Sequence, residues 1–306
     1  MAGPTTAGSA AARSDVAAVP LGMDTTQQVA ADTVEEVRDP GHARPRRSRL
    51  SGRTWWQPAL VLLALIGVGY GIAGIFALQG RSFLWPAPHD VLYAATLEST
   101  ATSQIYPALL NSALVALSGL AVAVVLGVAV ATVMVQARWI ERSFYPYAVI
   151  LQCLPILAVA PLIGTIFGYN FLGKVVVTLL ISLFPMISNT LFGLQAADRA
   201  QRELFQLQGA SRWTTLTKLQ FPAAMPAIFV GLRNAAGLSV IGAIVGDQLL
   251  GQGSPGLGTA ITVFTSRTQG PEAFASILIA SLFGIAVFLI FGLLGRLAVG
   301  KWFDLG

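Results

Sequence analysis

The sequence predicts an all-α polytopic membrane protein with six transmembrane helices. Of its 306 residues, 55% are hydrophobic and only 11% are charged, and the mean hydropathy is +0.69. Soluble domains carry about a quarter charged residues. Apolar runs close to the ~20 residues needed to cross a bilayer recur along the chain. This composition excludes a soluble globular domain, and the net charge of +5 requires no nucleic acid to explain it.

The apolar runs define the predicted spans in chain order. They cover residues 58–78, 109–135, 148–167, 175–194, 227–250 and 277–299. The second run is longer than a bilayer requires and is expected to tilt or begin late. Pro155 and Pro161 interrupt the third. Between the last two runs, the segment 251–274 is rich in Gly, Pro, Ser and Thr, and its apolar stretch 260–264 predicts a short helix at the outer membrane surface. A plain connecting loop is the alternative.

Lys and Arg residues fall mainly on one set of flanks. The opposite set holds only Arg81, Lys174 and Arg267. The positive-inside rule therefore predicts that both termini are cytoplasmic. Residues 1–53 lack apolar periodicity and are predicted to be a disordered basic cytoplasmic tail, which leaves 54–306 as the transmembrane domain. The single cysteine, Cys153, excludes a disulfide within the chain, and no metal site is expected.

A polar segment, residues 203–222, lies between the fourth and fifth runs, within the loop 195–226. Asp198 is a plausible N-cap for a short helix that ends at Gly209, which supplies the left-handed residue. Ser211 can cap a second helix, which is expected to stop before Pro222. Apolar residues in an otherwise polar segment suggest a helix–turn–helix that fits a groove on another protein. An ordinary juxtamembrane loop is the alternative.

The spacing of this segment resembles the cytoplasmic EAA coupling loop of ABC importer permeases. Glu203, Gly209, Leu219, Phe221 and Pro222 fall in the register of that motif, whereas Leu204 and Phe205 replace its two alanines. The resemblance implies contact with an ATPase through these residues: Glu203, Leu204, Phe205, Leu207, Gly209, Ala210, Ser211, Arg212 and Trp213.

A second block extends the resemblance over roughly residues 105–300, to permeases of the nitrate, sulfonate and taurine type. It consists of 154–162, 167–168, 173–174, 184–194, 229–233 and the turn 256–258. The resemblance implies a type I importer permease in the bacterial inner membrane. The implied partners are a second copy of this chain, two ATPase subunits and an extracytoplasmic substrate-binding protein. The implied function is a pathway for a small polar or anionic organic solute, with alternating access.

Polar or helix-breaking residues within the apolar runs mark a candidate translocation pathway: Gln152, Pro155, Pro161, Ser188, Asn189 and Asp247. Prolines free carbonyl groups that neighbours or water must satisfy. Asn189 could instead make a helix-to-helix hydrogen bond. An ionisable residue inside a span is costly and suggests function, so Asp247 could guard an outer gate, or it could pin the turn 251–258. Arg233, near a helix end, is expected to be structural.

Two nucleotide-binding patterns occur in the sequence, but neither has the residues or the position that nucleotide binding requires. Residues 168–174 have P-loop spacing, but Val175 replaces the required Ser or Thr, and 69–74 match a dinucleotide fingerprint inside a span. The chain is therefore expected to bind no cofactor and to be no enzyme, with ATP and magnesium used by the partner ATPase. The alternative function is an ion- or proton-coupled secondary transporter or channel, which would need buried charges near the membrane midplane. An ABC exporter subunit is a weaker third possibility.

Overall fold

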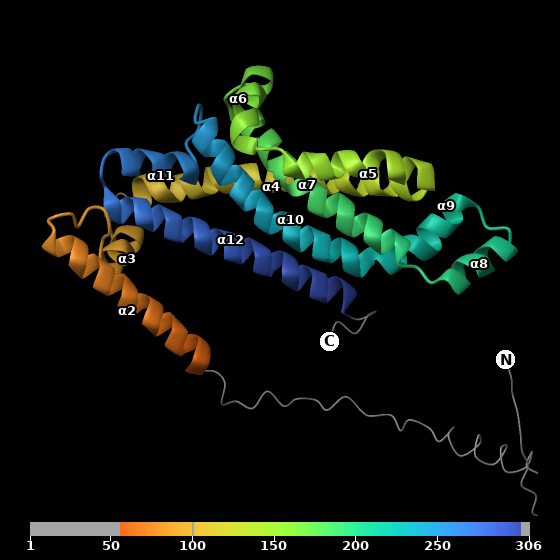
Figure 1. The fold of residues 1–306 in the computed structure, drawn as a ribbon, viewed down its shortest axis with the longest axis horizontal. Helices are drawn as coiled ribbons and strands as arrows, with labels where there is room; N and C mark the ends of the chain where they lie inside the picture. Colours follow the sequence, from red (N-terminus) through yellow and green to blue (C-terminus); the bar gives the residue numbers. More distant parts are fainter. Residues whose placement is uncertain (1–55, 100, 301–306) are drawn as a thin grey trace, which may run out of the picture. The chain divides into compact units, whose positions relative to one another are not determined.

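Every regular element in the described part of the chain, residues 56–99 and 101–300 of a computed structural model, is helical (Figure 1). The predicted tail over 1–53 lies outside the described residues. The elements are α2 (Trp56–Leu78), α3 (Pro88–Thr96), the π-helical turn η1 (Ala101–Ile105), α4 (Tyr106–Val135), α5 (Arg138–Cys153), α6 (Ile156–Phe167), α7 (Phe171–Gln195), α8 (Arg199–Leu207), α9 (Arg212–Thr215), the π-helical turn η2 (Leu216–Gln220), α10 (Phe221–Leu249), α11 (Leu257–Ser266) and α12 (Gly270–Val299).

Five helical stretches are long and apolar enough to cross a bilayer. They are Trp56–Leu78, Ser103–Val135, Phe171–Gln195, Arg212–Leu249 and Gly270–Ala298. The remaining predicted span, the third along the chain, is a pair of helices, α5 and α6, bent by 100°. The described helices thus give five spans, or six if the bent pair counts as one, in agreement with the predicted all-α fold.

The third predicted span is not one straight helix, and Pro155 explains the break. Leu154 has extended backbone geometry, with ψ of 127°. A residue before proline is pushed out of the helical region because the proline ring clashes with its backbone. Pro155 itself then precedes the first residue of α6. Pro161 was also predicted to interrupt this span, but it lies inside α6 without ending it, which corrects the prediction.

The core forms where α4, α7 and α10 pack against one another, with α12 on α10. Small residues let α7 and α10 approach closely. A Cβ added at Gly242 of α10 would lie 2.8 Å from the Cα of Thr178 in α7, and one added at Gly193 of α7 would lie 2.8 Å from the Cβ of Ala227 in α10. In lipid, helices associate through van der Waals packing at such close approaches, because the lipid tails are as apolar as the side chains and supply no hydrophobic driving force.

The segment after α10 contains the predicted short helix, which extends beyond 260–264 to form α11. It packs on α12 and α10, with Leu257 and Phe264 buried. In Figure 1, α11 lies toward the end of α10 that is opposite α8 and α9. The polar segment and the α11 region therefore occupy the two ends of one long helix.

Candidate functional site

Residues 198–215 form the predicted helix–turn–helix. The Asp198 carboxylate accepts a hydrogen bond from the Ala200 amide at 3.1 Å and so caps α8. Gly209 has φ of +68°, the left-handed geometry that non-glycine residues rarely adopt. The Ser211 hydroxyl accepts a hydrogen bond from the Thr214 amide at 3.1 Å and caps α9. The predicted caps and turn are thus confirmed.

The second helix does not stop before Pro222, which corrects the prediction. A continuous helical stretch runs from Arg212 to Leu249 through the π-helical turn η2. The Phe221 amide donates to the Leu216 carbonyl, five residues earlier. Pro222 has no amide hydrogen to donate, and it falls in the first turn of α10, where such a hydrogen is not needed. The polar segment is therefore joined to α10 without a hinge of irregular backbone.

Two anchors hold the segment on the transmembrane helices. The Arg202 guanidinium donates to the backbone carbonyls of Leu194, at 3.4 Å, and of Gln195 at the end of α7. Leu216 is fully buried and packs with Leu191 and Leu194. These contacts place α8 and α9 at the end of α7 and at the start of α10.

The apolar side chains of the segment remain largely uncovered in the described chain. The exposed fractions are 52% for Leu204, 87% for Leu207 and 69% for Trp213. Phe205 and Ala210 are half-buried, whereas Glu203, Ser211 and Arg212 are exposed. Glu203 pairs with Arg199 at 2.9 Å on the surface, an ion pair of little energetic weight. We call Leu204, Leu207 and Trp213 the coupling surface.

Three of the predicted pathway residues, Gln152, Ser188 and Asn189, line one pocket of about 510 Å³. The remaining lining residues are Phe184, Pro185, Asn234, Gly237, Leu238 and Phe288. We call this the carboxamide pocket, because Gln152, Asn189 and Asn234 contribute three side-chain amides. Asn234 was not predicted, although it carries the same signal as Asn189, a carboxamide within an apolar run.

Asn189 is held by its own helix. Its side-chain amide nitrogen donates to the Pro185 carbonyl at 2.8 Å, and the Ser188 hydroxyl donates to the same oxygen at 3.4 Å. Pro185 lies inside α7. The hydrogen bond of Asn189 is therefore within α7, not the helix-to-helix bond that was the alternative. Gly231 of α10 makes room for it, since a Cβ there would lie 2.8 Å from the Cβ of Asn189.

The two predicted prolines of the third span lie outside the pocket lining. Pro155 stands at the break, three residues beyond Gln152. The Pro161 carbonyl accepts hydrogen bonds from the hydroxyl of Thr165 at 2.9 Å and from that of Tyr169 at 3.3 Å. Their contribution to a pathway stays a prediction.

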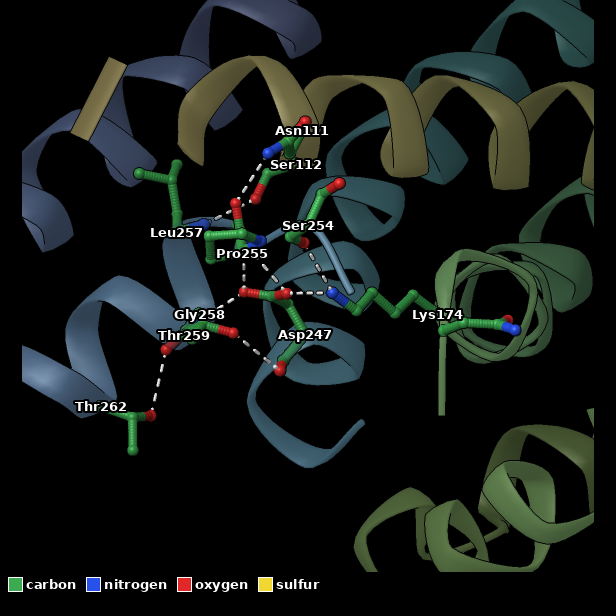
Figure 2. Close-up of polar contacts among 12 residues, drawn as sticks. Asn111, Ser112, Lys174, Asp247, Ser254, Pro255, Leu257, Gly258, Thr259 and Thr262 are labelled. Carbon is green, nitrogen blue, oxygen red and sulfur yellow. Dashed lines mark hydrogen bonds and ion pairs between the residues drawn. The ribbon is translucent and has the colours of Figure 1, made fainter. Parts of the chain in front are cut away.

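Asp247 lies at the other end of α10, in a buried polar cluster (Figure 2). Its carboxylate pairs with the Lys174 ammonium at 2.6 Å, and both side chains are 3% exposed. It also accepts hydrogen bonds from the amides of Gly256, at 3.1 Å, and Thr259, at 2.6 Å. Asp247 therefore fixes the turn 251–258, which was one of its two predicted roles.

Neighbouring groups complete this cluster. Lys174 donates to the Ser254 carbonyl at 3.0 Å, and Asn111 of α4 donates to the Pro255 carbonyl at 2.8 Å. The Ser112 hydroxyl accepts from the Leu257 amide at 2.9 Å. The turn before α11 is thus tied to α4, α7 and α10. The sequence analysis treated Lys174 as a flanking charge and as part of the rejected P-loop pattern and of the family resemblance, and did not predict its pairing with Asp247.

Within residues 56–99 and 101–300, no group of three His, Cys, Asp or Glu side chains could hold a metal ion. The polar groups of the carboxamide pocket are neutral hydrogen-bonding groups without an adjacent nucleophile and base. This arrangement is suited to contact a passing solute, and the coupling surface is suited to contact another protein.

Residues 123–302 match the family described as binding-protein-dependent transport system inner membrane component. A formylaminopyrimidine transport permease protein from Halalkalibacterium halodurans is 36% identical over 210 residues, which are 68% of this chain and 82% of that protein. A riboflavin transport system permease protein from Chloroflexus aurantiacus is 33% identical over 54% of this chain and 60% of its own length.

A putative aliphatic sulfonates transport permease protein from Bacillus subtilis is 27% identical over 79% of this chain and 84% of that protein, which confirms the predicted resemblance to permeases of this type. In such transporters the permease is not an enzyme, and ATP hydrolysis belongs to a separate subunit. The chain belongs to the binding-protein-dependent transport system inner membrane components, the permease subunits of ABC importers.

Proposed function

We propose that this chain forms, as a homodimer, the translocation pathway of an ATP-driven importer for a small polar or anionic organic solute. A substrate-binding protein delivers the solute on the outer side, and two ATPase subunits dock on the coupling surfaces of the two copies. The observation that carries the proposal is the exposure of Leu204, Leu207 and Trp213 on a segment that continues into a pocket-lining helix. Exposed apolar groups on a polar segment mark a protein contact.

Movement would pass from the ATPase to the pathway through α10. The helical stretch Arg212–Leu249 joins Trp213, on the coupling surface, to Asn234, in the carboxamide pocket. Packed helices shift as rigid units because a close-packed core has few intermediate arrangements. Closing of the two ATPases on ATP would therefore move the coupling surface and reorient α10, and the pathway would alternate between its two sides.

The distribution of positive charge supports an orientation with both termini in the cytoplasm of a bacterial cell. Arg138 and Arg142 begin α5, and Arg199, Arg202 and Arg212 lie in or beside α8 and α9. Cytoplasmic loops carry such an excess of Lys and Arg. In this orientation the coupling surface faces the compartment that contains ATP.

The relatives support an organic solute. Their names specify transport of formylaminopyrimidine, riboflavin and aliphatic sulfonates, which are all small organic molecules. Family membership also favours an ATP-driven importer over the alternative of a secondary transporter or channel. The buried Lys174–Asp247 pair does not support a secondary transporter or channel, because its two charges bind each other and backbone groups.

Copurification tests the proposed function. The tagged full chain, extracted in mild detergent from its own host, should retain an ABC ATPase that mass spectrometry identifies. The double variant Leu207→Asp, Trp213→Asp should lose that ATPase, because two charges would be buried in an apolar contact. Leu97→Asp is the matched control, since Leu97 is also highly exposed, at 74%, but lies at the end of α3. Retention of the ATPase by the double variant would overturn the docking site.

A further inference from the structure

Arg233 is a positive charge within the helical bundle that has no anionic partner among the described residues. Its guanidinium carbon lies 3.9 Å from the centre of the Phe288 ring on α12. The residue is half-buried: Nε is enclosed without a hydrogen-bond acceptor, whereas the terminal nitrogens are open to a ligand. The ion pairs of the described chain all involve other residues. A charge inside a span is costly, and the aromatic ring compensates it only in part. An anion from outside the chain would complete this site.

Arg233 lies on the seam between α10 and α12, near the end of the bundle that carries the coupling surface. A Cβ added at Gly292 of α12 would lie 3.1 Å from its Nε, and one added at Gly295 would lie 3.2 Å from the Cβ of Phe229. The end of α12 therefore lies beside the start of α10. Gly292 is seven residues before Val299, the last residue of α12, which is about 10 Å at 1.5 Å per residue. From this depth a long Arg side chain can extend toward lipid headgroups.

Arg296 adds a second guanidinium to the same seam. Phe288, Gly292 and Arg296 are spaced by four residues and so share one face of α12. Arg296 is exposed, lies one turn closer to the end of α12 than Gly292, and has no ion pair within the described chain. Guanidinium groups bind phosphate oxygens in a bidentate manner, and basic sites between transmembrane helices bind acidic lipid headgroups. The two arginines are therefore suited to bind a phosphate group.

An apolar groove of about 740 Å³ continues along this seam, away from the coupling surface. It begins at Gly237, one turn beyond Arg233 on α10, and beside Phe288. On α12 its lining extends from Leu289 to Ile277, 12 residues or about 18 Å. Apart from one serine, its lining consists of apolar residues and two glycines. A cationic end near the membrane surface and a deeper apolar groove match the phosphate and the acyl chain of a phospholipid.

We propose that the seam between α10 and α12 binds one anionic phospholipid, with its phosphate on Arg233 and Arg296 and an acyl chain in the groove. An anionic lipid is favoured over a zwitterionic one, because the two positive charges attract the phosphate and repel a headgroup ammonium. The lipid would supply the counter-charge that Arg233 lacks among the described residues. It would also fill a groove that faces the bilayer, where water cannot satisfy apolar walls.

Native mass spectrometry of the full chain in detergent measures this binding, with phosphatidylglycerol and phosphatidylethanolamine of identical acyl chains as probes. Phosphatidylglycerol is anionic, whereas phosphatidylethanolamine carries an ammonium group. The wild-type chain should bind phosphatidylglycerol about threefold to tenfold more tightly than phosphatidylethanolamine. Arg233→Gln and Arg296→Gln should each weaken phosphatidylglycerol binding about tenfold, the effect of losing one charge-assisted hydrogen bond.

Matched variants separate this site from general attraction between the chain and lipids. Arg142→Gln removes an exposed arginine of α5 and should leave phosphatidylglycerol binding within about twofold of wild type. Gly284→Leu should fill the groove and weaken binding of both lipids, and it fits because an added Cβ meets only Val240, at 3.7 Å. Ala286→Leu changes an exposed residue of α12 that does not line the groove, and it should weaken neither.

Gel filtration of each variant reports folding. If Arg233→Gln is not monodisperse, Arg233→Lys replaces it. Lysine keeps the charge but loses the planar fork that binds phosphate, so phosphatidylglycerol binding should still weaken about threefold. A competition with glycerophosphoglycerol, the same headgroup without acyl chains, shows whether the groove contributes. At an equal concentration it should not displace the bound lipid.

Four results would overturn the proposal: equal affinity for the two lipids, unchanged phosphatidylglycerol binding in the folded Arg variants, unchanged binding in Gly284→Leu, or displacement of the lipid by glycerophosphoglycerol. The last result would assign the two arginines to a soluble phosphate compound. The site is separate from the coupling surface, so its test is independent of ATPase capture.

Discussion

Removal of one partner from the Lys174–Asp247 pair should destabilise the bundle strongly. Lys174→Met keeps most of the side-chain volume but leaves the Asp247 carboxylate, 3% exposed, with only the amides of Gly256 and Thr259 as donors. Breaking a buried ion pair on one side costs about 3–5 kcal/mol, because the remaining charge stays buried. Asp247→Asn should also destabilise the folded bundle, because it leaves the buried Lys174 ammonium without its anion.

The thermal midpoint of the detergent-solubilised protein measures this effect. A change of 1 kcal/mol shifts the midpoint of a domain of 150–250 residues by about 2–4 °C, so a single substitution should lower it by roughly 6–20 °C. The double variant Lys174→Met, Asp247→Leu buries no charge and should recover much of the loss, because replacing both partners with apolar groups is often nearly neutral. Single variants within 2 °C of wild type, or a double variant as unstable as the singles, would refute the burial of the pair.

Two further predictions concern glycines. Gly209→Val should impair ATPase capture while membrane insertion remains normal, because φ of +68° costs a β-branched residue about 1–2 kcal/mol or more. Gly209→Asn should be tolerated, because Asn adopts the left-handed geometry more readily. Capture assays compare the two variants, and equal capture would show that the turn geometry is dispensable. Gly242→Leu should abolish monodisperse protein on gel filtration, because its Cβ alone would lie 2.8 Å from the Thr178 Cα. Gly71→Leu on α2, where nothing lies within 4 Å, is the control, and similar profiles for both variants would contradict the close packing of α7 and α10.

Local signals in the sequence were sufficient for much of the fold. The apolar runs located the helices α2, α4, α7, α10 and α12, because helix length and hydropathy are set by the residues of each segment. Asp198, Gly209 and Ser211 were identified as caps and turn for the same reason, since a cap acts within three residues of its own position. These features need no knowledge of the tertiary structure.

The features that were missed depend on contacts between distant segments or on the choice among local geometries. Lys174 and Asp247 are 73 residues apart, so nothing in either segment reveals that they form a pair. The predicted break occurs at Pro155, whereas Pro161 lies within α6 and Pro222 falls in the first turn of α10 after a π-helical turn. The same residue type allows a break or a helix start, and the packing of the neighbouring helices decides between them.

In the proposed mechanism, the coupling surface and the carboxamide pocket act on each other through α10. The most direct test uses Asn234→Cys in a Cys153→Ser background, which removes the single native cysteine, and measures the rate of maleimide labelling in the assembled transporter with and without ATP plus vanadate. Trapping the ATPase should change the labelling rate at position 234, and Leu207→Asp with Trp213→Asp should abolish the change. A labelling rate that is the same in both states of an assembled, ATP-hydrolysing transporter would show that α10 does not link the two sites.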